Sequence, residues 1–250
     1  MFQLYIIARN TFKESLRKKI LLSLGVSCFF ILSISLLLGH LSLDERVRLM
    51  MNFGLAAVQI SLVILSVFLG TSIISGDLEK KTLLIVLTRP LRPSLYFLGR
   101  YLGVSLILLM SLVVLALLLT LFLVYLQAPL SIPIIPVFFG MYLESLFLLA
   151  FVVFFASYSN SFLVLIYSFS LFIVGHFVDS LKYLLGEGDS LLSKILYCIP
   201  NLERVNWKSI VVYGDTLPLR DFFSSSIYIW CWIVLMLSLA FVHLEKRDFL

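Results

Sequence analysis

Six long apolar runs constrain the fold of this chain of 250 residues. They cover residues 20–39, 54–75, 101–126, 137–157, 162–178 and 224–243. A helix needs roughly 20 apolar residues to cross the hydrocarbon core of a bilayer, and each run has about this length. With 61% hydrophobic and 13% charged residues, the composition also lies far from that of soluble domains. The sequence predicts an all-α membrane protein with six transmembrane helices, and a single transmembrane domain over residues 1–250.

The Lys and Arg residues predict the orientation, because short cytoplasmic loops are enriched in them. If both termini are cytoplasmic, twelve of the 19 bases fall on that side. The twelve are Arg9, Lys13, Arg17, Lys18, Lys19, Lys80, Lys81, Arg89, Arg92, Arg100, Lys246 and Arg247. We therefore predict a multi-pass protein of a bacterial-type inner membrane with cytoplasmic termini. Bases that flank the bilayer also account for the net charge of +5, so no nucleic-acid partner is expected.

The N-terminal residues 1–19 have the periodicity of an amphipathic helix. Leu4, Ala8, Phe12 and Leu16 recur every four residues, and basic residues lie on the opposite side. Such a helix lies in the interface plane of the membrane. It is either a simple anchor, or an elbow helix that braces the first span and contacts a cytoplasmic partner.

A charged segment at residues 76–94 separates the second and third apolar runs. Each of its charges would cost about 3 kcal/mol at the bilayer centre, so the segment must lie in water. Asp77 near its start and Arg89 near its end suit the helix dipole, and Pro90 disfavours helical geometry at the residue before it. We predict a short cytoplasmic helix between spans two and three, which either only connects the spans or docks on a partner.

This arrangement resembles the permease subunits of ABC-2 type transporters, also called type V ABC exporters. That family has an elbow helix, six spans, and a coupling segment of the form E-x-x-x-T-L-x-x-L-L-x-x-P followed by basic residues. Matching roles here fall to Glu79, Thr82, Leu83, Leu87, Pro90, Arg92 and Arg100, although the spacing differs and Lys81 stands where Gly is frequent. The resemblance implies that this segment couples to a separate ATPase. The coupling residues would be Asp77, Glu79, Lys81, Thr82, Leu83, Leu87, Arg89, Pro90 and Arg92.

The resemblance further implies a homodimer or heterodimer of permeases with two ATPase subunits, which bind ATP and Mg. The chain itself has no G-x-x-x-x-G-K-[ST] motif and no catalytic constellation within its spans. We therefore predict no enzymatic activity, cofactor or metal in this chain. The predicted function is the permease subunit of an ATP-driven exporter. The alternative is an ATP-independent secondary transporter or channel, for which inverted repeats and broken helices are expected.

Polar residues within the spans indicate where a path could run. Glu144 lies eight residues after Pro136, roughly 12 Å below the outer surface at 1.5 Å per residue. It either lines a translocation path or pairs with a Ser, Tyr or Asn of a neighbouring helix. Gln59 and Asn52 in the second span either line the same path or join helices by hydrogen bonds.

The outer loop at residues 179–224 spans about 45 residues, too long and too apolar for an idle connection. In the family that the chain resembles, this region forms re-entrant helices that close the outer end of the path. Candidate gate residues are His176, Asp179 and Trp207. His176 and Asp179 are one turn apart, a spacing more typical of a structural hydrogen bond than of a metal site. A cap without a gating role is the alternative.

Overall fold

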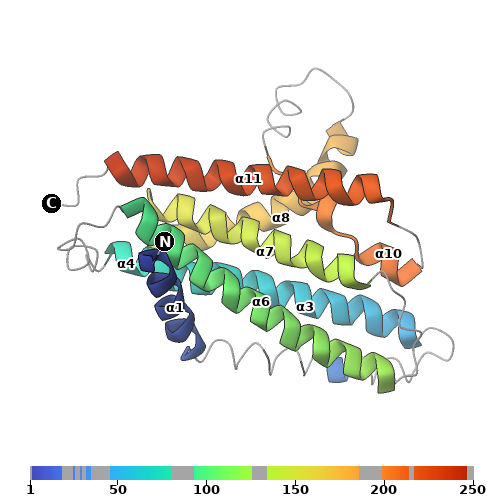
Figure 1. Cartoon of the computed structure of the whole chain (residues 1–250). Helices are drawn as coiled ribbons and strands as arrows, with labels where there is room; N and C mark the ends of the chain where they lie inside the picture. Colours follow the sequence, from blue (N-terminus) through green and yellow to red (C-terminus); the bar gives the residue numbers. More distant parts are fainter. Residues whose placement is uncertain are drawn as a thin grey trace.

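The computed structural model describes residues 2–18, 25, 29, 32–34, 46–79, 93–125, 134–185, 199–213 and 217–246 (Figure 1). Secondary structure within these residues is helical. The elements are α1 (Phe2–Leu16), α3 (Arg46–Gly70), the π-helix η1 (Thr71–Ser75), α4 (Gly76–Glu79), α6 (Pro93–Tyr125), α7 (Ile134–Ala156), α8 (Ser161–Leu185), the 3₁₀ helix η2 (Glu203–Val205), α10 (Lys208–Tyr213) and α11 (Leu219–Lys246).

Five helices in the described part of the chain are long and apolar enough to cross a membrane. They are Val47–Ser75, Pro93–Tyr125, Ile134–Ala156, Ser161–Leu184 and Leu219–Lys246. The prediction of an all-helical, multi-pass membrane protein is confirmed to this extent. The first predicted span, residues 20–39, lies mostly outside the described residues.

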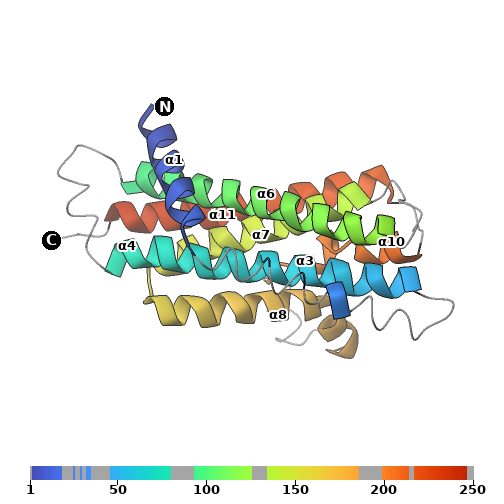
Figure 2. The same ribbon diagram turned by 90° about the horizontal axis from the view of Figure 1, so that it is seen from below.

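The long helices run along one common axis and give the bundle two distinct ends (Figures 1 and 2). One end, which we name the α4 end, carries α4, the start of α6 and the end of α11. The opposite end carries α10 and is named the α10 end. If the basic residues orient the chain as predicted, the α4 end faces the cytoplasm.

Helix α7 lies at the centre of the bundle. It contacts α3, α6, α8 and α11, and its residues from Leu143 to Ala150 are all buried. A helix that is apolar all round is buried by its neighbours, whereas the more peripheral helices leave one apolar face uncovered. Val113 of α6, Ile173 of α8 and Val234 of α11 are accordingly more than half exposed.

The second span continues past its apolar run without a break. Gly70 and Gly76 both have right-handed helical geometry, and the N–H of Gly76 donates to the carbonyl of Thr71. This i to i−5 bond belongs to a π turn, which joins α3 to α4 in one rod. Helix α4 thus begins at Gly76, beside the predicted start near Asp77, but it continues directly from the second span. The rest of the predicted cytoplasmic helix, residues 80–92, lies outside the described residues.

Helix α6 begins at Pro93, eight residues before the apolar run that starts at residue 101. Proline is favoured at the first helical position, where its missing N–H would have no partner. The helix therefore carries Arg100 on its own surface near the α4 end.

Helix α1 crosses the bundle axis at the α4 end and packs on α6 (Figure 2). A Cβ built on Gly103 would lie 2.5 Å from Cβ of Thr11 and 2.7 Å from the carbonyl of Ala8. Gly99, four residues earlier, meets Ile7 in the same way. Two glycines at this spacing allow helices to approach closely. The sequence predicted the helix, but not the two glycines of α6 on which it packs.

Candidate functional site

Buried polar side chains from three spans meet in the middle of the bundle. Glu144 lies near the centre of α7, and its side chain is only 2% exposed. Nε2 of Gln59 on α3 donates to Oε2 of Glu144 at 2.6 Å. Nε2 of His176 on α8 lies 2.7 Å from Oε1 of the same carboxyl group. The structure thus brings together three residues that the sequence placed in two separate candidate sites.

Two residues of the outer region complete this group. Nδ1 of His176 lies 3.0 Å from Oε2 of Glu203 in η2. Nζ of Lys208 in α10 donates to Oε1 of Gln59. We name these five residues the midspan cluster: Gln59, Glu144, His176, Glu203 and Lys208. They connect α3, α7 and α8 to η2 and α10.

The pKa values of Glu203 and Lys208 depend on their surroundings in the midspan cluster. The hydrogen bond with His176 lowers the pKa of Glu203, and further hydrogen bonds from Nδ2 of Asn206 at 2.9 and 3.0 Å act in the same direction. Burial lowers the pKa of Lys208, although Glu144 and Glu203 oppose this shift. Neither Glu203 nor Lys208 was identified from the sequence. The available signal was weak: Glu203 and Lys208 stand on either side of the candidate Trp207, in a loop that carries other charged residues as well.

Residues 199–213, named the outer segment, pack tightly on the bundle at two glycines. A Cβ on Gly140 of α7 would lie 2.5 Å from the carbonyl oxygen of Val205. A Cβ on Gly175 of α8 would lie 2.8 Å from Cδ1 of Leu202, whose N–H donates to the Gly175 carbonyl at 3.0 Å. The missing side chains let the outer segment settle between α7 and α8, with Leu202 and Val205 buried.

The remaining candidates of the outer region have other partners. Both nitrogens of His176 face carboxylates of the midspan cluster, and Asp179 instead accepts from Nδ2 of Asn201 at 2.7 Å. Trp207 is 5% exposed, with its ring 5.2 Å from that of Phe222. Asn52 lies about two turns from Gln59 on α3 and is exposed. Within the described residues, no group of His, Cys, Asp and Glu could hold a metal ion.

A second polar cluster lies at the α4 end and centres on Arg100. Its NH1 lies 2.6 Å from Oε2 of Glu14 on α1, and its NH2 lies 2.7 Å from Oδ2 of Asp77 on α4. Nε donates to the hydroxyl of Tyr96, which in turn donates to Asp77 at 2.9 Å. We name Glu14, Asp77, Tyr96 and Arg100 the base cluster. Arg100 therefore connects α1, α4 and the base of α6.

Burial makes the base cluster sensitive to the loss of one partner. The side chains of Arg100 and Asp77 are only 13% and 16% exposed. Burial raises the pKa of Asp77, while the charge of Arg100 lowers it in opposition. A buried charge left without its partner is strongly destabilising. The contact of Arg100 with Glu14 differs, because the Glu14 side chain is 47% exposed.

Most of the predicted coupling residues lie outside the residues that the structure describes. Asp77 joins the base cluster, and Glu79 lies in α4 with its side chain outside the described residues. The others, also outside, are Lys81, Thr82, Leu83, Leu87, Arg89, Pro90 and Arg92. The sequence identified Arg100 only as a base beside the membrane and as a match to the family motif.

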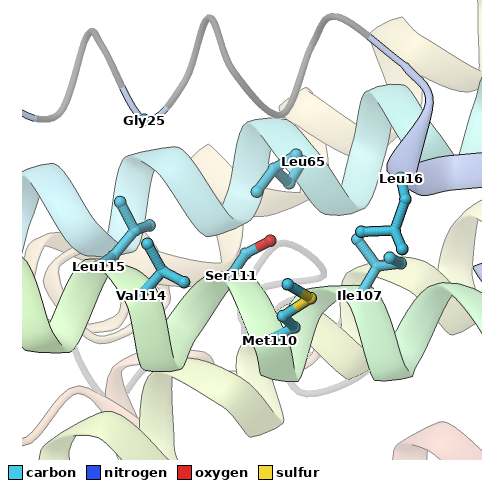
Figure 3. A pocket seen from close by; sticks show the side chains of 8 residues that line it. All are labelled: Leu16, Gly25, Leu65, Ile107, Met110, Ser111, Val114 and Leu115. Atoms are coloured by element: carbon cyan, nitrogen blue, oxygen red, sulfur yellow. The ribbon is translucent and has the colours of Figure 1, made fainter.

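A cavity of about 220 Å³ lies between α3 and α6 (Figure 3). Its lining carries no charge, and its side chains offer only the hydroxyl of Ser111 as a polar group. The lining residues are Leu16, Gly25, Leu65, Ile107, Met110, Ser111, Val114 and Leu115. This cavity therefore offers no recognition of a polar ligand.

Comparison of the chain with protein-family models finds no match, and comparison with curated proteins finds none either. The function must therefore be argued from the two clusters and from the arrangement of the spans.

Proposed function

We propose that this chain is the membrane-spanning permease subunit of an ATP-driven exporter of the ABC-2 type. It would work as a dimer with two separate ATPase subunits, which bind ATP and Mg. The observation that carries the proposal is the position of Arg100. One side chain holds together α1, the start of the charged segment and the base of a transmembrane helix. Helix α1 and the charged segment are the two surfaces that a cytoplasmic motor subunit would contact.

The base cluster suggests how force would enter the bundle. When ATP draws the two ATPases together, they would displace the charged segment and α1. Because Arg100 is bonded to both, α6 would move with them as one body. Helix α6 spans the bundle from the α4 end to the opposite end, so a tilt at its base would open the path near the outer segment.

A secondary transporter is the second candidate, and the pair of Glu144 and His176 favours it. Ionisable residues inside a membrane often mark a proton path. Two observations rank this candidate lower. Helix α7 runs unbroken through Glu144, whereas transporters of this class bind their ions at interrupted helices. The two contacts of His176 connect Glu144 to Glu203 in the outer segment. They therefore lead toward the α10 end, and not across the bundle as a proton path would.

Replacement of residues 80–92 by a Gly/Ser linker of equal length should abolish binding of the ATPase. The change leaves Asp77, Arg100 and every described span intact, so membrane insertion should continue. The wild-type protein, purified in mild detergent from its host, should bring down a soluble protein with a phosphate-binding loop in a two-plus-two complex. Mass spectrometry of both purified samples measures this result.

The matched control is Ser209→Ala, an exposed position in α10 at the opposite end of the bundle. It should retain the ATPase in full. A wild-type protein that is recovered without any ATPase, yet moves substrate along an ion gradient in vesicles, would establish the secondary transporter instead.

A further inference from the structure

The imidazole of His176 lies between two carboxyl groups. Its Nε2 is 2.7 Å from Oε1 of Glu144, and its Nδ1 is 3.0 Å from Oε2 of Glu203. Each contact needs one hydrogen between the two atoms, because lone pairs would otherwise face each other. A neutral imidazole carries only one N–H hydrogen. The two contacts together therefore require one additional proton, held either on the imidazole or on a carboxyl group.

We propose that Glu144, His176 and Glu203 form a proton-binding site that fastens the outer segment to the bundle. With the proton bound, both contacts of His176 are satisfied, and η2 is held above α7 and α8. When the proton leaves, one nitrogen faces a carboxylate without a hydrogen between them. This proposal does not depend on the identity of the energy source.

The direction of proton exchange follows from exposure. The side chain of Glu203 is 43% exposed, whereas that of Glu144 is 2% exposed. On the other side of Glu144, the next turns of α7 present the buried apolar residues Phe147, Leu148 and Phe151. The proton therefore enters and leaves at the α10 end, and the site senses the pH of that side.

The other partners of Glu144 and Glu203 decide which of the two contacts of His176 is lost. Glu144 is held by Gln59 from a neighbouring span and cannot leave the bundle. Glu203 lies on the outer segment, and its other side-chain partner is Asn206, in the same segment. Loss of the proton therefore releases Glu203, and the outer segment loosens from α7 and α8.

A test of this site must account for the other charged residues near His176. Lys208 contacts Gln59 and could add its own titration at alkaline pH. Asp179, one turn along α8, is engaged with Asn201. Arg204 lies over the ring of Tyr228 on α11, 4.8 Å from its centroid. Among these, Lys208 is the group whose titration must be separated from that of the proposed site.

The test measures thiol accessibility in a protein whose three native cysteines are replaced by Ser. Val205→Cys reports on the outer segment, because Val205 belongs to this segment and is only 2% exposed where the segment packs on α7. Ser209→Cys, at an exposed position, corrects for the pH dependence of thiol reactivity. Ala150→Cys, fully buried in α7, reports on global unfolding. Each is labelled with a charged maleimide in mild detergent, with any bound partner retained.

The labelling of Val205→Cys relative to Ser209→Cys should rise roughly tenfold from about pH 6 to about pH 10, the effect of losing one hydrogen bond to a charged group. Ala150→Cys should stay unlabelled throughout. His176→Ala in the Val205→Cys background should give the high ratio at every pH, because both contacts are absent.

Glu144→Gln provides the decisive variant, because its amide supplies the missing hydrogen. The amide nitrogen donates to Nε2 of a neutral His176, whose Nδ1–H then donates to Glu203, and the amide oxygen still accepts from Gln59. The Val205→Cys ratio should therefore stay low across the whole pH range. The proposal is overturned if the wild-type ratio is flat, or if Glu144→Gln keeps the wild-type pH dependence, as it would if Lys208 were the titrating group.

Discussion

Arg100→Met should lower the free energy of unfolding by about 3–5 kcal/mol, the usual effect of removing one partner from a buried ion pair. The variant removes the guanidinium charge 2.7 Å from the buried Asp77 and removes the donors that join α1 and α4 to α6. In a chain of this length the midpoint of thermal unfolding should fall by roughly 10 °C, measured in mild detergent. ATP-driven transport should be lost at temperatures where the protein is still folded.

Two control variants distinguish the effect of the buried Arg100–Asp77 pair from that of the more exposed contact of Arg100 with Glu14. Glu14→Ala should change the midpoint little, because the Glu14 side chain is nearly half exposed and Arg100 keeps Asp77. Asp77→Leu combined with Arg100→Met should recover much of the lost stability, since no buried charge remains. If Arg100→Met is as stable as the wild type, the base cluster does not hold these helices together.

Gly103→Ala should displace α1 from α6 and destabilise the protein by about 1–3 kcal/mol, a typical effect of overpacking. The new methyl group would lie 2.5 Å from Cβ of Thr11 and 2.7 Å from the carbonyl of Ala8, neither of which can rotate away. Digestion with trypsin at Arg9 and Arg17 should become faster, because α1 no longer packs on the bundle.

Gly76→Ala is the matched control for this change. Gly76 is also helical, and a Cβ built there meets nothing within 4 Å. In both variants alanine favours the helix over glycine by about 1 kcal/mol, so the difference between them isolates the contact with α1. Equal stability and equal digestion of the two variants would contradict close packing at Gly103.

The sequence predicted the described spans well because membrane insertion depends on local composition. The apolar runs 54–75, 101–126, 137–157, 162–178 and 224–243 coincide with helices of the structure. The sequence predicted the ends of these helices poorly, since a helix continues through polar residues as long as its backbone hydrogen bonds persist. Helix α6 thus begins at Pro93 and α3 at Arg46, both outside the apolar runs.

The clusters were predicted only in part, because their partners lie far apart in the chain. Glu144 was identifiable from the cost of a carboxyl group within a span, and Gln59 from its polarity. Their contact joins positions 85 residues apart, which no local pattern specifies. His176 was expected beside Asp179, one turn away on its own helix. It turns instead toward Glu144 and Glu203, because helix packing places those carboxyl groups on both sides of its ring.

The π turn at Thr71–Ser75 determines how the two clusters are oriented around a shared helix. Gln59 of the midspan cluster and Asp77 of the base cluster lie on the same rod, formed by α3, η1 and α4. The π turn inserts one residue between them relative to a regular α-helix, and one residue corresponds to a rotation of about 100°. The angle between Gln59 and Asp77 about the helix axis is therefore set within these five residues. Deletion of a single residue there would turn Asp77 away from Arg100 while Gln59 kept its place beside Glu144.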